Sequence, residues 1–208
     1  MSGRFIVIDG IEGAGKSTQL PVIADWIGQR HGEPLMTREP GGTPLAERIR
    51  SLVLADHEEP MPQMAELLMM FASRAVHLHN KVLPALQSGQ WVLCDRFVDS
   101  SFAYQAAGQG LDPAQVQWLE SAVVGNRTPD CTLIFDLPTE QVIDRIRQRA
   151  HADRFDRADQ AFLGRVREAF LERAAAAPDR YVVVDATQSI EQVSTCVIRE
   201  LEARFAIA

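Results

Sequence analysis

The stretch GIEGAGKST, residues 10–18, follows the apolar run FIVID, residues 5–9, and decides the fold. Its members are Gly10, Ile11, Glu12, Gly13, Ala14, Gly15, Lys16, Ser17 and Thr18. They match G-x-x-x-x-G-K-[ST], a loop whose glycines bring backbone N–H groups against a polyphosphate. Lys16 would reach the β- and γ-phosphates, and the Ser17 hydroxyl would be a ligand for Mg²⁺. An accidental glycine turn is the alternative, but the strand before the loop and the amphipathic stretch after it are both present. The sequence therefore predicts nucleotide binding here.

Composition narrows the class of protein. The chain has 208 residues, 46% of them hydrophobic and 24% charged, which fits one large globular domain. Its formal net charge of −7 argues against nucleic acid as the main partner. Cys94, Cys131 and Cys196 are far apart in the sequence. This spacing favours buried reduced thiols over a disulfide or metal framework. No signal-peptide pattern and no apolar run of about 18 residues is present, so we expect a cytoplasmic protein with no membrane partner.

Short β-rich runs alternate with longer helical patterns, which predicts a five-stranded parallel α/β sheet flanked by helices. The expected strands are Phe5–Asp9, Pro34–Thr37, Trp91–Asp95, Thr132–Asp136 and Tyr181–Asp185. The expected helices are Ser17–Arg30, Pro44–Leu54, Met64–Leu86, Pro113–Val124 and Ile190–Phe205. The third of these helices is expected to end or kink at Pro84, and residues 106–110 are expected to form a flexible loop.

Four strands end at an aspartate, namely Asp9, Asp95, Asp136 and Asp185. Ligands of open α/β sheets bind outside the carboxyl ends of the strands, so these aspartates are well placed for a site. The alternative is that they cap helices, which we expect for about half of them. Asp95 is followed by Arg96, and this pair would offer Mg²⁺ coordination beside a phosphate clamp. A salt bridge at the strand end is the alternative.

Arginines mark two further segments. Arg74 shares a helix face with Met70 and Phe71, and an apolar surface beside guanidinium donors suits a nucleobase. A core helix whose arginine extends to solvent explains the same pattern. Between residues 144 and 157 lie Arg145, Arg147, Arg149, Arg154 and Arg157. This segment is interpreted either as a solvated surface helix or as a lid over transferring phosphates.

Taken together, the residues resemble one family, the thymidylate (dTMP) kinases, over essentially the whole chain. The resemblance rests on the phosphate loop, on TREPGGT at residues 37–43, and on DRFVDSSFAYQ at residues 95–105. It implies a P-loop NTPase fold of the nucleoside monophosphate kinase type, with one domain over residues 1–208 and a lid over about residues 145–159. The implied reaction transfers a phosphoryl group from ATP, with Mg²⁺, to dTMP in dTTP biosynthesis. The family forms homodimers, and the helix from Met64 to Leu83 would serve as the interface or as a core helix.

The resemblance also implies residue roles. Lys16 and Arg96 would bracket the phosphates, with Arg38 and Arg50 nearby, and Ser17 and Asp95 would organise Mg²⁺. Glu12 would lie near the sugar 3′-hydroxyl. Arg74, Ser101 and Gln105 would contact thymine, and Tyr104 would crowd the 2′ position. Catalytic arginines would come from the lid, with Arg149 and Arg154 as candidates.

Two departures from the family pattern stand out. The aromatic residue that stacks on thymine commonly lies four residues before the base-binding arginine, where this chain has Met70 and places Phe71 one residue later. The loop after Tyr104-Gln105 has Ala106, Ala107 and Gln109 where glycines and an arginine are usual. Two other functions stay open at this point: a kinase acting on dUMP, CMP or GMP, and a phosphate-loop regulatory ATPase.

Overall fold

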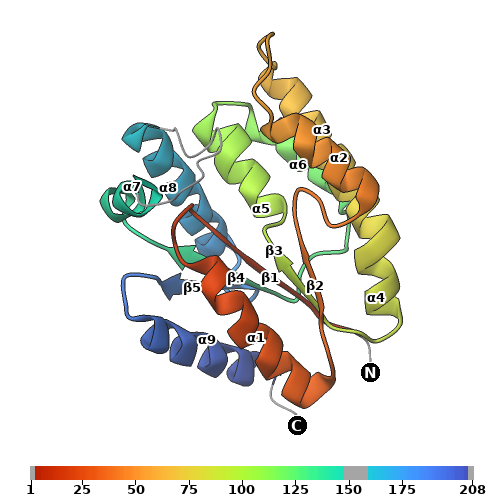
Figure 1. Cartoon of the computed structure of the whole chain (residues 1–208), viewed down its shortest axis with the longest axis vertical. Helices are drawn as coiled ribbons and strands as arrows, with labels where there is room; N and C mark the ends of the chain where they lie inside the picture. The colour runs from red at the N-terminus through yellow and green to blue at the C-terminus, as the bar shows by residue number, and fades with distance from the viewer. Residues whose placement is uncertain (1–2, 148–158, 206–208) are drawn as a thin grey trace.

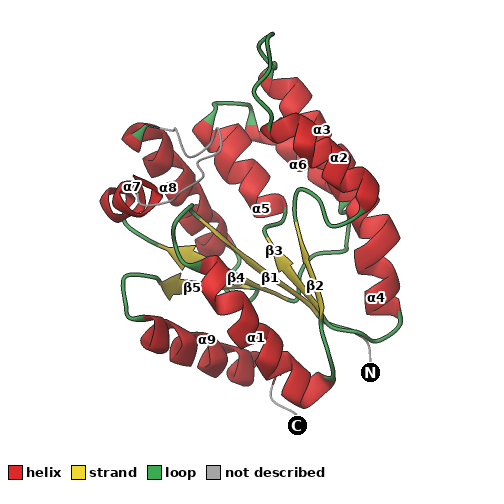
Figure 2. Ribbon diagram, in the orientation of Figure 1, coloured by secondary structure: helices red, strands yellow, loops and turns green. Residues whose placement is uncertain are grey.

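A five-stranded parallel sheet with the order β2-β3-β1-β4-β5 lies between two layers of helices (Figures 1 and 2). The structure is a computed structural model that describes residues 3–147 and 159–205. The strands are β1 (Phe5–Gly10), β2 (Leu35–Arg38), β3 (Val92–Asp95), β4 (Cys131–Asp136) and β5 (Tyr181–Asp185). The predicted five parallel strands are confirmed, with boundaries that shift by one residue at most.

The helices of the first half are α1 (Lys16–His31), α2 (Pro44–Leu54), α3 (Gln63–His77), the π-helical turn η1 (Leu78–Val82) and α4 (Leu83–Gln87). Those of the second half are α5 (Val98–Ser101), the π-helical turn η2 (Phe102–Gly108), α6 (Pro113–Val123), α7 (Thr139–Arg147), α8 (Gln160–Ala176) and α9 (Ile190–Phe205). None of these helices is long and apolar enough to cross a membrane.

The alternation of side chains along β1 divides the core into two halves. Ile6 and Ile8 pack in one hydrophobic cluster with Ile23 of α1. Phe5 and Val7 belong to a second cluster, which contains Phe71 of α3. Since a strand inside a parallel sheet is covered on both faces, every residue of β1 is buried. Figure 1 shows the corresponding layers, with α1 and α9 side by side on one face of the sheet.

The carboxyl ends of the central strands meet at one edge. Ile8 of β1 pairs with Asp95 of β3, and Arg38 of β2 pairs with the same residue from the other side. Gly10 pairs with Phe135 of β4. The order reverses around β1, and ligands of such sheets bind outside the strands at this reversal. The phosphate loop and the Asp95-Arg96 pair therefore lie together.

Two local expectations were wrong. Residues 106–108 continue the helical segment η2 and are no flexible loop. Gly108 is buried, and a Cβ built there would lie 2.7 Å from Cε2 of Phe162, so this glycine permits close packing. The third predicted helix leaves the α-helical pattern earlier, at η1, whereas Pro84 lies in the first turn of α4, where proline is accepted.

Candidate active site

The phosphate loop curls from β1 into α1. Gly10, Gly13 and Gly15 have φ angles of 125°, 72° and 83°, a region that favours glycine. A Cβ at Gly10 would lie 2.4 Å from the carbonyl oxygen of Phe135, so the first glycine also permits contact with β4. The amino end of α1 consequently opens into the concave side of the loop, which is the arrangement that binds phosphate anions.

Lys16 lies inside this curl. Its Nζ donates to the carbonyl oxygens of Gly10 at 2.9 Å and of Ile11 at 2.7 Å. Burial, together with the nearby Arg96 guanidinium, lowers the pKa of Lys16 to about 8. The side chain is therefore largely charged at neutral pH.

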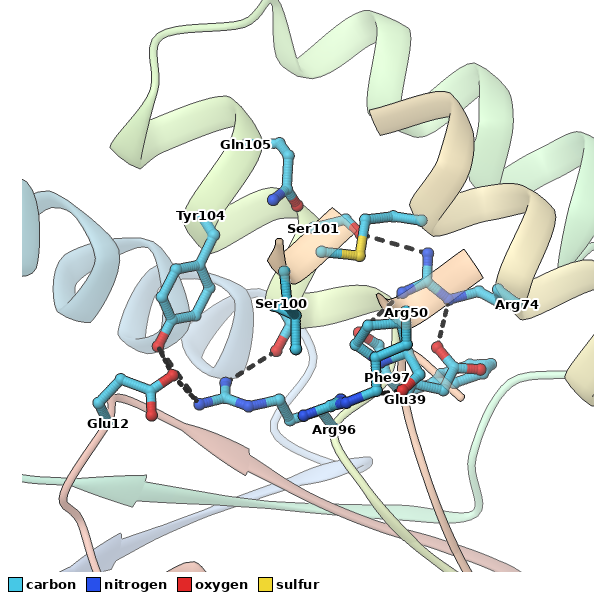
Figure 3. A pocket seen from close by; sticks show the side chains of 13 residues that line it. Glu12, Glu39, Arg50, Arg74, Arg96, Phe97, Ser100, Ser101, Tyr104 and Gln105 are labelled. Carbon is cyan, nitrogen blue, oxygen red and sulfur yellow. Dashed lines mark hydrogen bonds and ion pairs between the residues drawn. The ribbon is translucent and has the colours of Figure 1, made fainter. Parts of the chain in front are cut away.

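Arg96 follows β3 with a φ of 68° and crosses from the sheet edge to the loop. Its NH1 donates to Oδ1 of Asp9 at 3.3 Å, and its NH2 donates to Oε1 of Glu12 at 2.5 Å. The Tyr104 hydroxyl also donates to Glu12, at 3.3 Å, and Figure 3 shows these side chains at one end of the pocket. Burial raises the pKa of Tyr104 far above its usual range, so the hydroxyl stays protonated. Two carboxylates thus hold the guanidinium in a fixed orientation.

Asp9 is the fully buried partner in this arrangement. It accepts hydrogen bonds from the backbone N–H groups of Phe97 and Ser100, each at 3.2 Å, and from the Ser100 hydroxyl at 2.8 Å. Burial raises the pKa of Asp9 to about 6, against the lowering effect of Arg96. From sequence Asp9 was recognised only as a strand-end carboxylate, and its tie to Arg96 depends on strands that are far apart in the chain.

A pocket opens beside Arg96. It is lined by Glu12, Glu39, Pro40, Arg50, Leu54, Met70, Arg74, Arg96, Phe97, Ser100, Ser101, Tyr104 and Gln105. The structure therefore brings together every residue that the sequence predicted for the acceptor nucleotide except Arg38 and Phe71.

The far end of the pocket is formed by Arg74. Its Nε donates to Oε2 of Glu39 at 2.7 Å, and its NH1 donates to the Ser101 hydroxyl at 3.2 Å. The guanidinium lies over the ring of Phe71, 4.5 Å from the centroid. Phe71 is buried beneath the arginine and does not line the pocket, whereas Met70 does. Of these two neighbours, Met70 alone faces the pocket.

Arg38 lies apart from this pocket. Its NH2 donates to Oε2 of Glu47 at 3.0 Å, and about half of its side chain is exposed. It lines a neighbouring groove that also contains Asp95. Arg50 does line the pocket, and its NH1 donates to the Pro40 carbonyl at 2.9 Å.

The basic segment is described only in part. Arg145 on α7 donates to the carbonyl oxygen of Gly13 at 3.1 Å, which places one cation of this segment against the phosphate loop. Arg149, Arg154 and most of the expected lid, residues 148–158, lie outside the described residues.

The residues expected to organise Mg²⁺ fit that ion. Oδ1 of Asp95 is buried, with no hydrogen-bond partner among the described residues, and Ser17 is exposed at the first turn of α1. In the described part of the chain no three His, Cys, Asp or Glu side chains gather in a way that could hold a metal ion. Mg²⁺ commonly keeps several waters and is bound by one or two protein ligands together with substrate phosphates.

Comparison with known proteins identifies the family. The thymidylate kinase family model matches residues 8–197. The thymidylate kinase of Pseudomonas fluorescens is 53% identical over 193 residues, 93% of this chain and 92% of that protein. That of Teredinibacter turnerae is 49% identical over 203 residues, 98% of this chain and 99% of that protein. The crystal structure of thymidylate kinase from Ehrlichia chaffeensis superposes with a TM-score of 0.80 at 32% identity, covering 97% of this chain and 99% of that one. Neither a different monophosphate kinase nor a regulatory ATPase is favoured by these matches.

Proposed function

The chain belongs to the thymidylate kinase family and phosphorylates dTMP, and we propose that it holds dTMP in the pocket between Arg96 and Arg74. The observation that supports this orientation most strongly is the position of the two ends of the pocket relative to the phosphate loop. The Arg96 end borders the phosphate loop through Glu12 and Asp9, while the Arg74 end lies some way along α3. Figure 3 shows the two guanidinium groups reaching into the pocket from different elements.

At the phosphate end, Arg96 would bind the 5′-phosphate of dTMP, and Arg50 would contribute a second cation from α2. Arginine suits this role because its planar donors match phosphate oxygens in pairs. Glu12 and Tyr104 would lie at the sugar, where Glu12 would accept from the 3′-hydroxyl. The buried Tyr104 ring would occupy the space that a 2′-hydroxyl needs.

At the base end, Arg74 would donate to a carbonyl oxygen of thymine, with Ser101 and Gln105 as further polar partners. Met70 would cover the ring from one side. Gln105 is held by Glu66, which accepts from its Nε2 at 2.8 Å. The amide orientation is therefore set before a base arrives.

ATP would bind at residues 10–18, with its β- and γ-phosphates against the backbone N–H groups and Lys16. Ser17 and Asp95 would hold Mg²⁺, directly or through water. The bound metal would neutralise charge on the transferring phosphates. Arg149 and Arg154 from the lid segment would place further cations next to the transferring phosphates. Arg38 would lie at the edge of this phosphate site.

The chemical step needs positioning more than covalent participation. An oxygen of the dTMP phosphate attacks the γ-phosphorus of ATP, a new P–O bond forms, and the bond to the oxygen of ADP breaks. The attacking oxygen is already ionised at neutral pH, so no general base is required. Lys16 and Arg96 would keep the donor and acceptor phosphates in line and balance their charge.

We further propose a homodimer in the cytoplasm, built from one domain per chain. All five strands of the described residues belong to one sheet, which supports a single domain. Leu68 on α3 is 50% exposed and Trp118 on α6 is 69% exposed, although both are large and apolar. These helices contact each other, so a second copy of the chain could cover both residues at once.

Two substitutions test the assignment of the phosphates. Lys16→Ala and Arg96→Ala are each expected to lower kcat by orders of magnitude, about 10²-fold or more, because each removes a cation from the transition state. Circular dichroism and thermal unfolding would show whether the variants are folded. Near-normal activity in either folded variant would contradict the role given to that residue.

A further inference from the structure

A series of buried and partly buried side chains lies behind the base end of the pocket. Oγ1 of Thr37 is 2.7 Å from Nε2 of His77, and Nδ1 of His77 is 3.0 Å from Oε1 of Glu39. Oε2 of Glu39 accepts from Nε of Arg74 at 2.7 Å. Glu39 and Arg74 line the pocket, whereas His77 is completely buried and does not.

The donors in this series can be assigned by chemistry. A carboxylate oxygen accepts, so Nδ1–H of His77 donates to Oε1 of Glu39. Nε2 of His77 pairs with the Thr37 hydroxyl. Both oxygens of Glu39 are thereby occupied, one by His77 and one by Arg74, and the carboxylate has one orientation.

The guanidinium of Arg74 is fixed on its remaining sides. NH2 donates to the carbonyl oxygen of Phe97 at 3.1 Å, and NH1 donates to Ser101. The rings of Phe71 and Phe97 lie 4.5 and 5.5 Å from the central carbon of the guanidinium. Of these partners, Glu39 alone is charged, so the direction of the Arg74 fork depends most on how Glu39 is held.

The backbone around His77 is built to admit its ring. Gly42 has a φ of 85°, and a Cβ there would lie 2.7 Å from Cδ2 of His77 and 2.6 Å from Oγ1 of Thr37. His77 is also the last residue of α3, directly before the π-helical turn η1. π-Helical turns change the direction of side chains and recur at functional sites.

We propose that His77 is a positioning residue for recognition of the base: through Glu39 it fixes the Arg74 donors toward the carbonyl group at position 4 of thymine. The inference rests on the proposed placement of dTMP. It predicts selectivity against dCMP, because cytosine carries an amino group where thymine carries that carbonyl, and two donors would then face each other.

Two substitutions separate the two bonds of His77. In His77→Asn the amide nitrogen can take the place of Nδ1 and keep the bond to Glu39, whereas in His77→Gln it can take the place of Nε2 and reach only Thr37. We expect His77→Gln to raise KM for dTMP about tenfold and to reduce the preference for dTMP over dCMP by a similar factor, as loss of a charge-assisted hydrogen bond would. KM for ATP of His77→Gln is expected to stay within about twofold of the parent enzyme. For His77→Asn, every kinetic parameter is expected to stay within about threefold of the parent enzyme. The control is His79→Asn, an exposed histidine of η1.

Arg74→Ala is measured in parallel. If it leaves KM for dTMP unchanged, the placement of the base in the proposed function is wrong. If Arg74→Ala raises this KM and His77→Gln does not, the placement stands and the role of His77 is overturned. Equal losses of thermal stability and kcat in His77→Asn and His77→Gln, with KM for dTMP and the dTMP/dCMP preference unchanged, would show a structural role only and would also overturn it. Should His77→Gln not fold, Thr37→Val is expected to raise KM for dTMP about threefold, and an unchanged KM there would contradict the inference.

Discussion

The guanidinium of Arg96 forms an ion pair with the carboxylate of Asp9, 3.3 Å between NH1 and Oδ1, and the Asp9 side chain is completely buried. Ser100 bridges the two, because its hydroxyl donates to Asp9 and its oxygen lies 3.1 Å from NH1 of Arg96. The residue proposed to bind the acceptor phosphate is therefore held by a carboxylate that solvent does not reach.

This relationship predicts an acid limit to activity. Burial raises the pKa of Asp9 to about 6, so the carboxylate that orients Arg96 is lost as the pH falls through this value. We expect kcat/KM for dTMP to fall below about pH 6. The second ionisation of a phosphate monoester also lies near pH 6, so the wild-type profile alone does not identify the group. The variant Asp9→Asn separates the two groups. Its pH profile of kcat/KM for dTMP should lose the decrease that Asp9 causes below about pH 6, and an unchanged decrease would contradict the assignment.

Stability should change in the opposite direction. The pKa of Asp9 in the folded state lies above its value of 3.8 in an unperturbed chain, so folding favours the protonated group. Its contribution to stability is complete below about pH 4 and is lost as the pH rises through about 6. Between pH 7 and pH 5.5, Asp9 should therefore not lower the melting temperature, whereas kcat/KM for dTMP should fall. Parallel decline of both would indicate general acid unfolding.

Met70 and Phe71 are expected to respond differently to truncation. Met70→Ala should raise KM for dTMP about tenfold or less, since it removes apolar contact with the base, and should cost little stability. Phe71→Ala should lower the free energy of unfolding by about 3–5 kcal/mol, since Phe71 is buried in the core beneath Arg74. Steady-state kinetics and urea unfolding of both variants provide the comparison. An unchanged KM for dTMP in a folded Met70→Ala variant would contradict the assignment.

Tyr104 is predicted to exclude ribonucleotides by the bulk of its ring. The ring is packed among aromatic neighbours, with its centroid 6.2 Å from that of Phe170. Tyr104→Phe keeps this ring and removes only the hydroxyl that donates to Glu12, so UMP and dUMP should be discriminated nearly as before. The ratio of kcat/KM for the two nucleotides is the measurement. A large gain in UMP use would mean that the hydroxyl, through Glu12, selects the sugar.

The proposed dimer is tested at Trp118. Trp118→Glu places a charge where two copies would bury an indole ring, and it should shift the sedimenting species from dimer to monomer. Trp118 is exposed in the single chain, so the monomer should remain folded. Arg127→Glu, which changes the charge of an exposed residue beyond α6, is the control. Sedimentation of the unaltered chain as a monomer would contradict the proposal directly.

The sequence was sufficient for the sheet and for most of the residues that line the candidate pocket, because both are encoded locally. The phosphate loop is a contiguous motif, and the expected acceptor residues come from three short segments and two helices. Glu39 and His77 were not assigned roles, since their pairing joins a loop to a helix nearly 40 positions away and leaves no periodic pattern. Met70 and Phe71 are neighbours that point about 100° apart on a helix, so only packing decides which one faces the ligand. The turns η1 and η2 were missed because π-helical turns share the composition of α-helices.

The most direct test is the initial rate of ADP formation by the purified protein with ATP and Mg²⁺, measured with dTMP, dUMP, CMP, GMP or no acceptor. The account predicts strong stimulation by dTMP, weaker stimulation by dUMP, and little with the others. Preferential stimulation by CMP or GMP would overturn the base-end assignment around Arg74 and Met70. ATP hydrolysis that no nucleotide stimulates would contradict phosphoryl transfer to dTMP altogether.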